Sequence, residues 1–220
     1  MVRPYAGIGT RMVVVRPVPL PGQLLVATPE ITEEPFRRTV LLLLDHDGDG
    51  TLGLVVNRPT QLPVRHVLPG WHGEVVNPPV VFSGGPVSPD SALGLARLAP
   101  TDDGNGAGGR WAASRKVGGR QAGAPIGWKR LYEDVGLVDL DAPPEIVRDG
   151  VAAMRVFAGY AGWGPGQLDE ELRRGSWLVV DAALSDPFDS APTELWPAVL
   201  RRLGPPLAFA ATYPDDPTAN

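Results

Sequence analysis

The sequence predicts one domain built mainly from short β-strands, with a few short helices between them. Two observations support this prediction. Apolar runs of strand length recur along the chain, and turns rich in glycine, proline and aspartate separate them. The chain also holds 27 glycines and 25 prolines in 220 residues, so we expect many turns and loops. A chain of this length is one large domain or two small ones, and we favour one.

Composition narrows the class of protein further. The chain is 43% hydrophobic, and no apolar run reaches the length needed to span a membrane. It has no cysteine, which excludes disulfides, thiolate catalysis and cysteine metal sites. The first twenty residues lack the pattern of a signal peptide. We therefore expect a soluble cytoplasmic protein with no membrane contact.

The formal net charge is −5, which argues against broad nucleic-acid binding. The charge is uneven, because residues 104–132 carry six basic side chains and no acid. Direct DNA binding through this segment is a third hypothesis for function and the weakest one. Such charges are more often part of a solvated loop.

The first half of the domain should begin with a core strand in residues 22–29. Residues 39–44, TVLLLL, form a continuous apolar run, which indicates a strand buried on both faces. The Asp/Gly-rich residues 45–50 and the apolar residues 52–56 follow, which predicts a β-hairpin. Residues 57–59, Asn-Arg-Pro, should end its second strand.

The middle of the chain is less regular. One short helix fits residues 62–71, and strands fit residues 78–87 and 91–98. Residues 101–125 contain seven glycines and no lasting periodicity, so we expect a flexible insertion there. We expect a strand and a short helix after it.

The rest of the chain is organised around Val156–Gly175, VFAGYAGWGPGQLDEELRRG. It predicts the end of a buried strand, a glycine-rich turn over residues 162–166 and a short helix with acids first and arginines last. A phosphate cradle is the alternative for this turn. The glycine spacing fits neither phosphate-binding motif, and three carboxylates follow, so we favour a tight corner with Trp163 packed over it.

The C-terminal part should hold a core strand in residues 176–182 and a last helix. Thr193 is the best capping residue for that helix, which should run to Leu203 and end at Gly204. We expect residues 1–21 to be an N-terminal extension, residues 22–212 to be the single domain and residues 213–220 to be a disordered tail.

The hairpin turn resembles a calcium-binding loop in part. Asp45, Asp47, Asp49 and Gly50 match positions 1, 3, 5 and 6 of an EF-hand loop. Position 12 needs a bidentate glutamate and is Val56, and a strand rather than a helix precedes the loop. We therefore favour a plain hairpin turn and expect no metal or other cofactor.

No set of residues predicts a catalytic centre. His66 and His72 lack the spacing of a helical zinc site, and nothing in the sequence places His46 beside them. Ser83 precedes two glycines but is not in a nucleophile elbow. We assign no catalytic residue.

Four stretches together resemble the YqgE/AlgH family of bacterial proteins. They are residues 22–59, the VFSGGPV stretch, residues 159–180 and the last helix with its Leu-Gly end. The resemblance implies an α+β fold in which a mixed, strongly bent sheet closes partly into a barrel, flanked by short helices. It implies no established activity and no catalytic residue set; one branch of the family is linked to transcriptional regulation.

Two main hypotheses for function follow. The first is a non-enzymatic cytoplasmic protein with a regulatory role, related to transcription, or an interaction role with a protein partner. The second is an enzyme or ligand-binding protein whose pocket is formed by three turns and takes a small anionic ligand. Its candidate residues, which would also make a partner surface, are Asn57, Arg58, Gly84, Gly85, Trp163, Gly164 and Gln167. Arg58 would be the anion contact.

Overall fold

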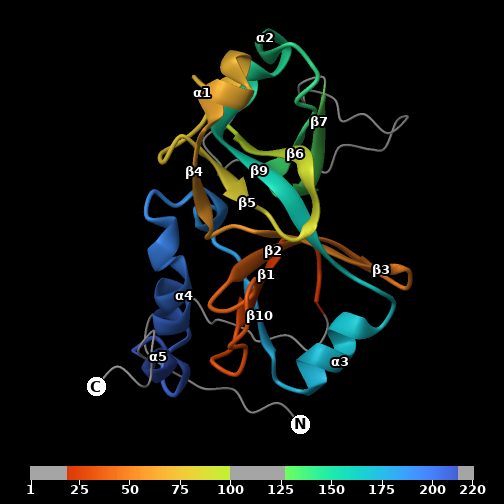
Figure 1. Ribbon diagram of the computed structural model, residues 1–220, viewed down its shortest axis with the longest axis vertical. Coiled ribbons are helices and arrows are strands. Elements are labelled where there is room, and N and C mark those ends of the chain that lie inside the picture. The colour runs from red at the N-terminus through yellow and green to blue at the C-terminus, as the bar shows by residue number, and fades with distance from the viewer. Residues whose placement is uncertain (1–18, 100–126, 213–220) are drawn as a thin grey trace, which may run out of the picture.

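A computed structural model describes residues 19–99 and 127–212 (Figure 1). The predicted insertion at 101–125, the predicted tail at 213–220 and all but the last residues of the predicted extension lie outside the described residues.

The described residues form ten strands and several short helices. The strands are β1 (Gln23–Ala27), β2 (Val40–Asp47), β3 (Gly50–Val55), β4 (Pro59–Pro63), β5 (Val80–Ser83), β6 (Val87–Leu98), β7 (Trp128–Tyr132), β8 (Val135–Val138), β9 (Val151–Trp163) and β10 (Trp177–Asp181). The α-helices are α1 (Val64–Val67), α2 (Pro144–Val147), α3 (Gln167–Arg173), α4 (Leu195–Leu203) and α5 (Leu207–Ala210), and 3-10 turns lie at Pro69–Trp71, Arg148–Gly150, Asp186–Phe188 and Pro192–Glu194.

All ten strands belong to one curled sheet. The main path runs β10-β1-β2-β3-β9-β6-β8-β7, with β4 and β5 attached beside β9. Neighbours are antiparallel except β5 and β9, which are parallel, so the sheet is mixed. Near one end of the path Gly22 precedes β1, and the Tyr132 ring of β7, at the other end, packs directly against it. The expected bent sheet that closes partly into a barrel is confirmed.

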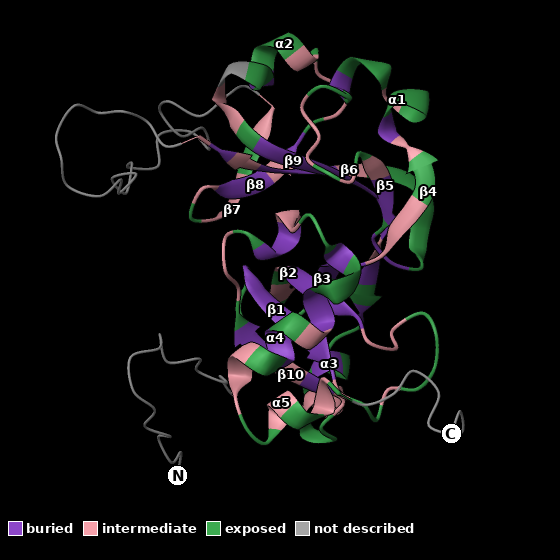
Figure 2. Cartoon of the chain, turned by 90° about the vertical axis from the view of Figure 1, so that its left-hand side faces the viewer, coloured by how far each residue is buried: buried purple, intermediate pink, exposed green. Residues whose placement is uncertain are grey.

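The curl gives the molecule two halves that share β9 (Figures 1 and 2). The largest cluster of buried side chains lies where the halves meet and includes Phe82, Phe157 and Trp196. Trp196 of α4 is buried, and its indole N–H donates to the carbonyl of Ala27 at 2.8 Å, which fixes the last helix against β1. A second cluster lies under α3, and a third lies under α1 and α2.

Gly159 lets β9 serve both halves. Before it, residues 151–158 of β9 run along β6. After it, Tyr160 still pairs with Val87 of β6, and residues 161–163 pair with β3. Gly159 has φ +69°, a left-handed conformation that favours glycine. The turn expected over residues 162–166 therefore begins later than predicted: the strand bends at Gly159 and continues to Trp163.

Arg155 is a buried charge in the same strand. Its guanidinium donates to the carbonyls of Asn77, Pro187 and Asp189 at 2.9–3.2 Å, and it lies 4.2 Å from the centre of the Phe82 ring. Burial lowers its pKa to about 10, against the favourable charge of Asp189. Arg155 thus holds the C-terminal segment against the sheet, a role that no sequence pattern indicated.

Most other expected elements are confirmed, including the β2–β3 hairpin and the stop at Gly204, which has φ +74°. The expected cap of the last helix is wrong. The residue that precedes α4 is Glu194, without a side-chain cap, because Thr193 lies inside a 3-10 turn that leads into the helix.

Candidate functional site

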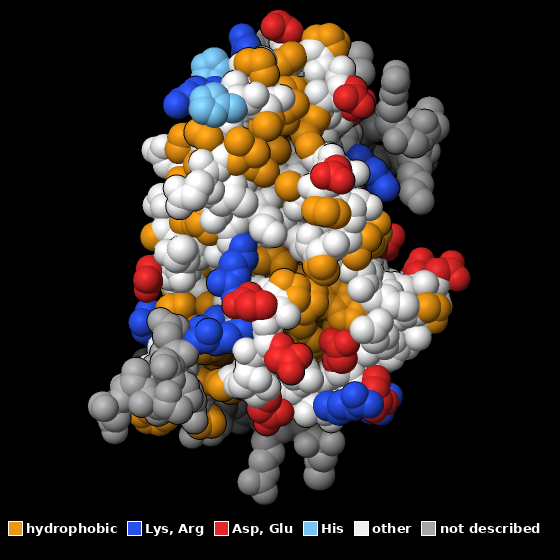
Figure 3. Space-filling model, in the orientation of Figure 1, with side chains coloured by type: hydrophobic (Ala, Val, Ile, Leu, Met, Phe, Trp, Pro, Cys, Tyr) orange, Lys and Arg blue, Asp and Glu red, His pale blue; other side chains and the backbone are white. Residues whose placement is uncertain are grey.

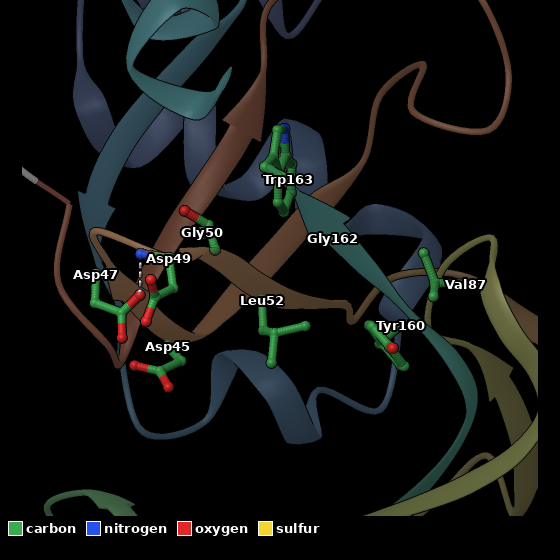
Figure 4. Close-up of a pocket in the computed structure, with 10 residues that line it drawn as sticks. Asp45, Asp47, Asp49, Gly50, Leu52, Val87, Tyr160, Gly162 and Trp163 are labelled. Carbon is green, nitrogen blue, oxygen red and sulfur yellow. Dashed lines mark hydrogen bonds between the residues drawn. The ribbon is translucent and has the colours of Figure 1, made fainter. Parts of the chain in front are cut away.

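A hollow of about 470 Å³ opens beside the β2–β3 hairpin (Figure 4). We call it the acidic hollow. Its lining residues are Asp45, Asp47, Asp49, Gly50, Thr51, Leu52, Val87, Tyr160, Gly162 and Trp163. Two motifs that stand more than 100 residues apart in the sequence, the Asp/Gly hairpin and the glycine-rich end of β9, therefore form one site.

Strand register explains why these residues meet. Leu52 pairs with Asp45 on one side and with Gly162 on the other, and Tyr160 pairs with Val87. Because side chains alternate along a strand, these five residues lie on one face of the sheet, in a row across four strands. Figure 4 shows this order, with the carboxylates on one side of Leu52 and Tyr160 on the other.

The hollow exists because glycine occupies the centre of this row. A Cβ on Gly162 would lie 3.8 Å from both the Tyr160 ring and the Val87 side chain, which is ordinary contact, so a side chain there would enter the hollow. The apolar centre of the hollow stays accessible, since Leu52 is 40% exposed and Val87 is 36% exposed.

The charge of the hollow comes from three exposed carboxylates. Asp47 accepts the backbone N–H of Asp49 at 2.8 Å, and Asp45 accepts the N–H of His46 at 3.0 Å. Within residues 19–99 and 127–212 no Lys or Arg forms an ion pair with any of the three. Figure 3 shows acidic side chains gathered at the edge where the hairpin projects. The site therefore favours a cation.

The opposite face of the hairpin carries a histidine and a hydroxyl. His46 and Thr51 are cross-strand partners, and His46 Nδ1 lies 2.7 Å from Thr51 Oγ1. Thr51 is buried and His46 is half-buried, so the hydrogen bond braces the hairpin from behind. A pair of this kind can move a proton only if a substrate reaches it, and the hydroxyl lies below the surface.

Trp163 belongs to that inner face and supports the hollow from below. It is 6% exposed and packs against Phe36 and Trp177 at ring-centre distances of 6.2 and 6.0 Å. The Oε2 atom of Glu171 accepts the indole N–H of Trp163 at 2.9 Å and that of Trp177 at 2.7 Å. The expected packing of Trp163 over the corner is confirmed.

The first predicted turn is held by the protein's own backbone. Asn57 is buried; its side chain accepts the N–H of Val40 and donates to the carbonyl of Arg38, both at 2.9 Å. The Arg58 guanidinium donates to the carbonyl of Arg37 and lies 3.6 Å from the carboxylate of Glu34. Arg58 thus already has an acidic neighbour where the second hypothesis placed an anion.

The second predicted turn lies beside the first. The Val55 N–H donates to the carbonyl of Gly84 at 2.8 Å, and the Ser83 N–H donates to that of Arg58 at 2.9 Å. Any Cβ on Gly84 would collide with the carbonyl of Gly159, and one on Gly85 with the backbone of Tyr160. These two glycines allow backbone to pack directly on β9.

The third predicted turn follows Trp163, the last residue of β9. The Gly164 N–H donates to the Gln167 side chain at 3.1 Å, and Gln167 donates in turn to Glu171 at 3.0 Å. Of the seven predicted residues, Trp163 lines the acidic hollow and the other six do not. The first two turns meet, whereas the third does not join them, and a ligand role for these residues stays a prediction.

Sequence reasoning missed Leu52, Val87 and Tyr160. One signal was present: Tyr160 and Gly162 alternate with Ala161 and Trp163, so a strand through Trp163 puts Tyr160 on the face opposite the tryptophan. The expected turn concealed that alternation.

The described residues contain no group of three His, Cys, Asp or Glu side chains arranged to hold a metal ion. Among the helices of residues 19–99 and 127–212, none is long and apolar enough to cross a membrane.

Residues 24–208 match the AlgH-like family, and the chain belongs to this family. It is 48% identical to a UPF0301 protein of Streptomyces avermitilis over 201 residues, which cover 91% of this chain and 95% of that protein. A UPF0301 protein of Streptomyces coelicolor is 50% identical over the same length and the same shares. The resemblance found in the motifs is thus confirmed.

Two solved structures share the fold. A crystal structure of a Corynebacterium diphtheriae protein aligns with a TM-score of 0.75 at 31% identity, covering 89% of this chain and 93% of that one. The solution structure of the AlgH protein from Pseudomonas aeruginosa aligns with a TM-score of 0.58 at 26% identity, covering 90% and 96%.

Proposed function

We propose that this protein is a non-enzymatic, cytoplasmic regulatory protein that influences transcription by binding a protein partner at the acidic hollow. The observation that carries the proposal is the row of exposed apolar and acidic side chains across four strands. Apolar groups that stay accessible on a sheet face, rimmed by charged residues, are typical of partner-binding surfaces.

The shape of the hollow favours contact over catalysis. Active sites commonly exclude water from the reacting groups. Here the three carboxylates stand on an exposed hairpin, and the only histidine–hydroxyl pair at this hairpin has its hydroxyl buried. An acidic surface also repels the phosphates of DNA, so a regulatory effect would pass through a protein partner.

The test replaces the gene in a bacterium that carries it and measures transcript levels. Three strains are compared with wild type: a deletion, a Gly162→Leu variant that fills the hollow, and a Gly162→Ala variant as the matched control. We expect the deletion and Gly162→Leu to change the same transcripts, while Gly162→Ala matches wild type. A deletion without effect on transcripts would overturn the regulatory role. A Gly162→Leu protein that is present at normal levels and behaves as wild type would remove the hollow from the proposal.

A further inference from the structure

We infer that the acidic hollow takes a basic segment of the partner protein, with one aliphatic or aromatic side chain inserted between flanking lysines or arginines. This inference rests on the proposed function, because it specifies the chemistry of the partner that binds there.

The inserted side chain is indicated by the centre of the hollow. Leu52, Val87 and the Tyr160 ring surround the space above Gly162, and all three keep part of their surface exposed. Burying this surface against an apolar side chain removes it from water, which is favourable. The hollow's volume of about 470 Å³ leaves room for a large side chain and its neighbours.

The acidic rim of the hollow indicates the basic residues that flank the inserted side chain. Asp45, Asp47 and Asp49 project from one hairpin, and the described residues supply no lysine or arginine that pairs with them. Their carboxylate oxygens accept hydrogen bonds and donate none. A segment with lysine or arginine next to its apolar side chain therefore complements the rim, whereas an acidic segment is repelled.

The width of the site favours a chain segment over a small cation. Small ligands bind in pockets that enclose most of their surface. The acidic hollow instead lies open along a row from β2 through β3 and β9 to β6. A segment that crosses these strands reaches the apolar centre and the acidic hairpin together, and a small cation reaches the hairpin alone.

The test uses synthetic nine-residue peptides and the purified full-length protein. The probe pool has leucine, phenylalanine or tryptophan at its centre and lysine or arginine on both sides. One control pool has alanine at the centre, a second has glutamate in place of the basic residues, and spermidine serves as a small cation. Binding is measured by fluorescence anisotropy at low and at high salt.

Two kinds of variant locate the binding. Gly162→Leu should weaken binding of the probe pool by at least about tenfold, because its side chain occupies the place of the inserted group. Asp45→Asn with Asp47→Asn should weaken it about two- to fivefold for each carboxylate, as for exposed ion pairs, and should flatten the salt dependence. The matched control is Asp141→Asn with Glu145→Gln, which removes the same charge near α2 and should leave binding unchanged.

Preference for the apolar centre, loss in both kinds of hollow variant and no loss in the control support the inference. Equal binding of the alanine-centred pool, or spermidine binding as tightly as the probe, would overturn it. If Gly162→Leu does not fold, the aspartate pair, which lies on an exposed hairpin, still decides the matter. The probe pool could fail to bind while the deletion and Gly162→Leu strains change the same transcripts. That result would reject the basic segment and keep the regulatory role. Binding of the probe pool without any change in transcripts would keep the basic segment and reject the regulatory role.

Discussion

Replacing Gly159 by alanine should destabilise the protein severely, whereas the same change at Gly162, three residues along the same strand, should not. A Cβ on Gly159 would lie 2.6 Å from the carbonyl oxygen of Gly85 and 2.8 Å from that of Val87, and both are backbone atoms that cannot rotate away. The residue also needs φ +69°, which costs an L-residue about 1–2 kcal/mol. Overpacking of this kind adds about 1–3 kcal/mol.

The expected total for Gly159→Ala is therefore about 2–5 kcal/mol, or a fall in melting temperature of roughly 4–20 °C for a chain of this size. In Gly162→Ala the new methyl group meets its nearest atoms at 3.8 Å, so we expect a change within about 1 kcal/mol. Thermal melts followed by circular dichroism compare the two. Equal melting temperatures would refute the idea that Gly159 lets β9 bend between the two halves of the sheet.

The opposing glycine gives a second, independent check of the same contact. A Cβ on Gly84 would collide with the carbonyl of Gly159, so both single variants disturb one backbone interface. Neighbouring sites of this kind are not additive. The loss of unfolding free energy in the double alanine variant of Gly84 and Gly159 should be smaller than the sum of the losses in the two single variants. The difference should exceed about 0.5 kcal/mol. Strict additivity in urea unfolding would show that the two positions act separately.

Three further predictions concern Tyr132, Trp163 and the Asp/Gly hairpin. The Tyr132 hydroxyl is buried without a hydrogen-bond partner among the described residues, so Tyr132→Phe should stabilise the fold by about 1 kcal/mol at pH 7; a loss of stability in urea unfolding would contradict this. Burial, helped by the charge of Asp186, raises the Tyr132 pKa above its usual value, so the folded state keeps a proton that the unfolded chain releases. Stability should therefore fall as the pH rises past about 10, and less steeply in Tyr132→Phe. Trp163→Ala should lower the free energy of unfolding by about 3–5 kcal/mol, and Trp163→Phe should lower it clearly less. An alanine variant that melts at the wild-type temperature would show that the ring contributes nothing to the core. Calorimetry with calcium should show no saturable heat below the millimolar range. The position where an EF-hand has its glutamate is occupied by Val56, which is fully buried. A micromolar calcium site that is lost in Asp47→Ala would overturn this prediction.

The strands were predictable where a continuous apolar run in the sequence indicates a buried segment. The apolar run before Asp45 became β2, and the Asp/Gly turn with its second apolar run became the hairpin with β3. The stop at Gly204 was predictable because a left-handed residue after a helix favours glycine. Local chemistry determines these features, and local chemistry is what a single sequence displays.

The acidic hollow was not predictable from local patterns. It requires Leu52 to pair with Gly162 and Val87 with Tyr160, and register between distant strands leaves no mark in either segment. The role of Arg155 was hidden for the same reason, since its partners are backbone carbonyls far along the chain. The resemblance to a family supplied the curled sheet, whereas the residues alone indicated only strands and short helices.

The glycine-rich end of β9 therefore carries two requirements that mutation can separate. Gly159 is needed by the fold, because backbone atoms of Gly85 and of the first residues of β6 occupy the space where its side chain would be. Gly162 is exposed, and a side chain there would enter the acidic hollow rather than the core. If the hollow binds a partner, Gly162→Leu should abolish that function in a protein that melts normally, whereas Gly159→Ala should lose function only as far as it loses structure. A Gly162→Leu variant that both folds and functions would mean that this glycine, too, serves only the path of the strand.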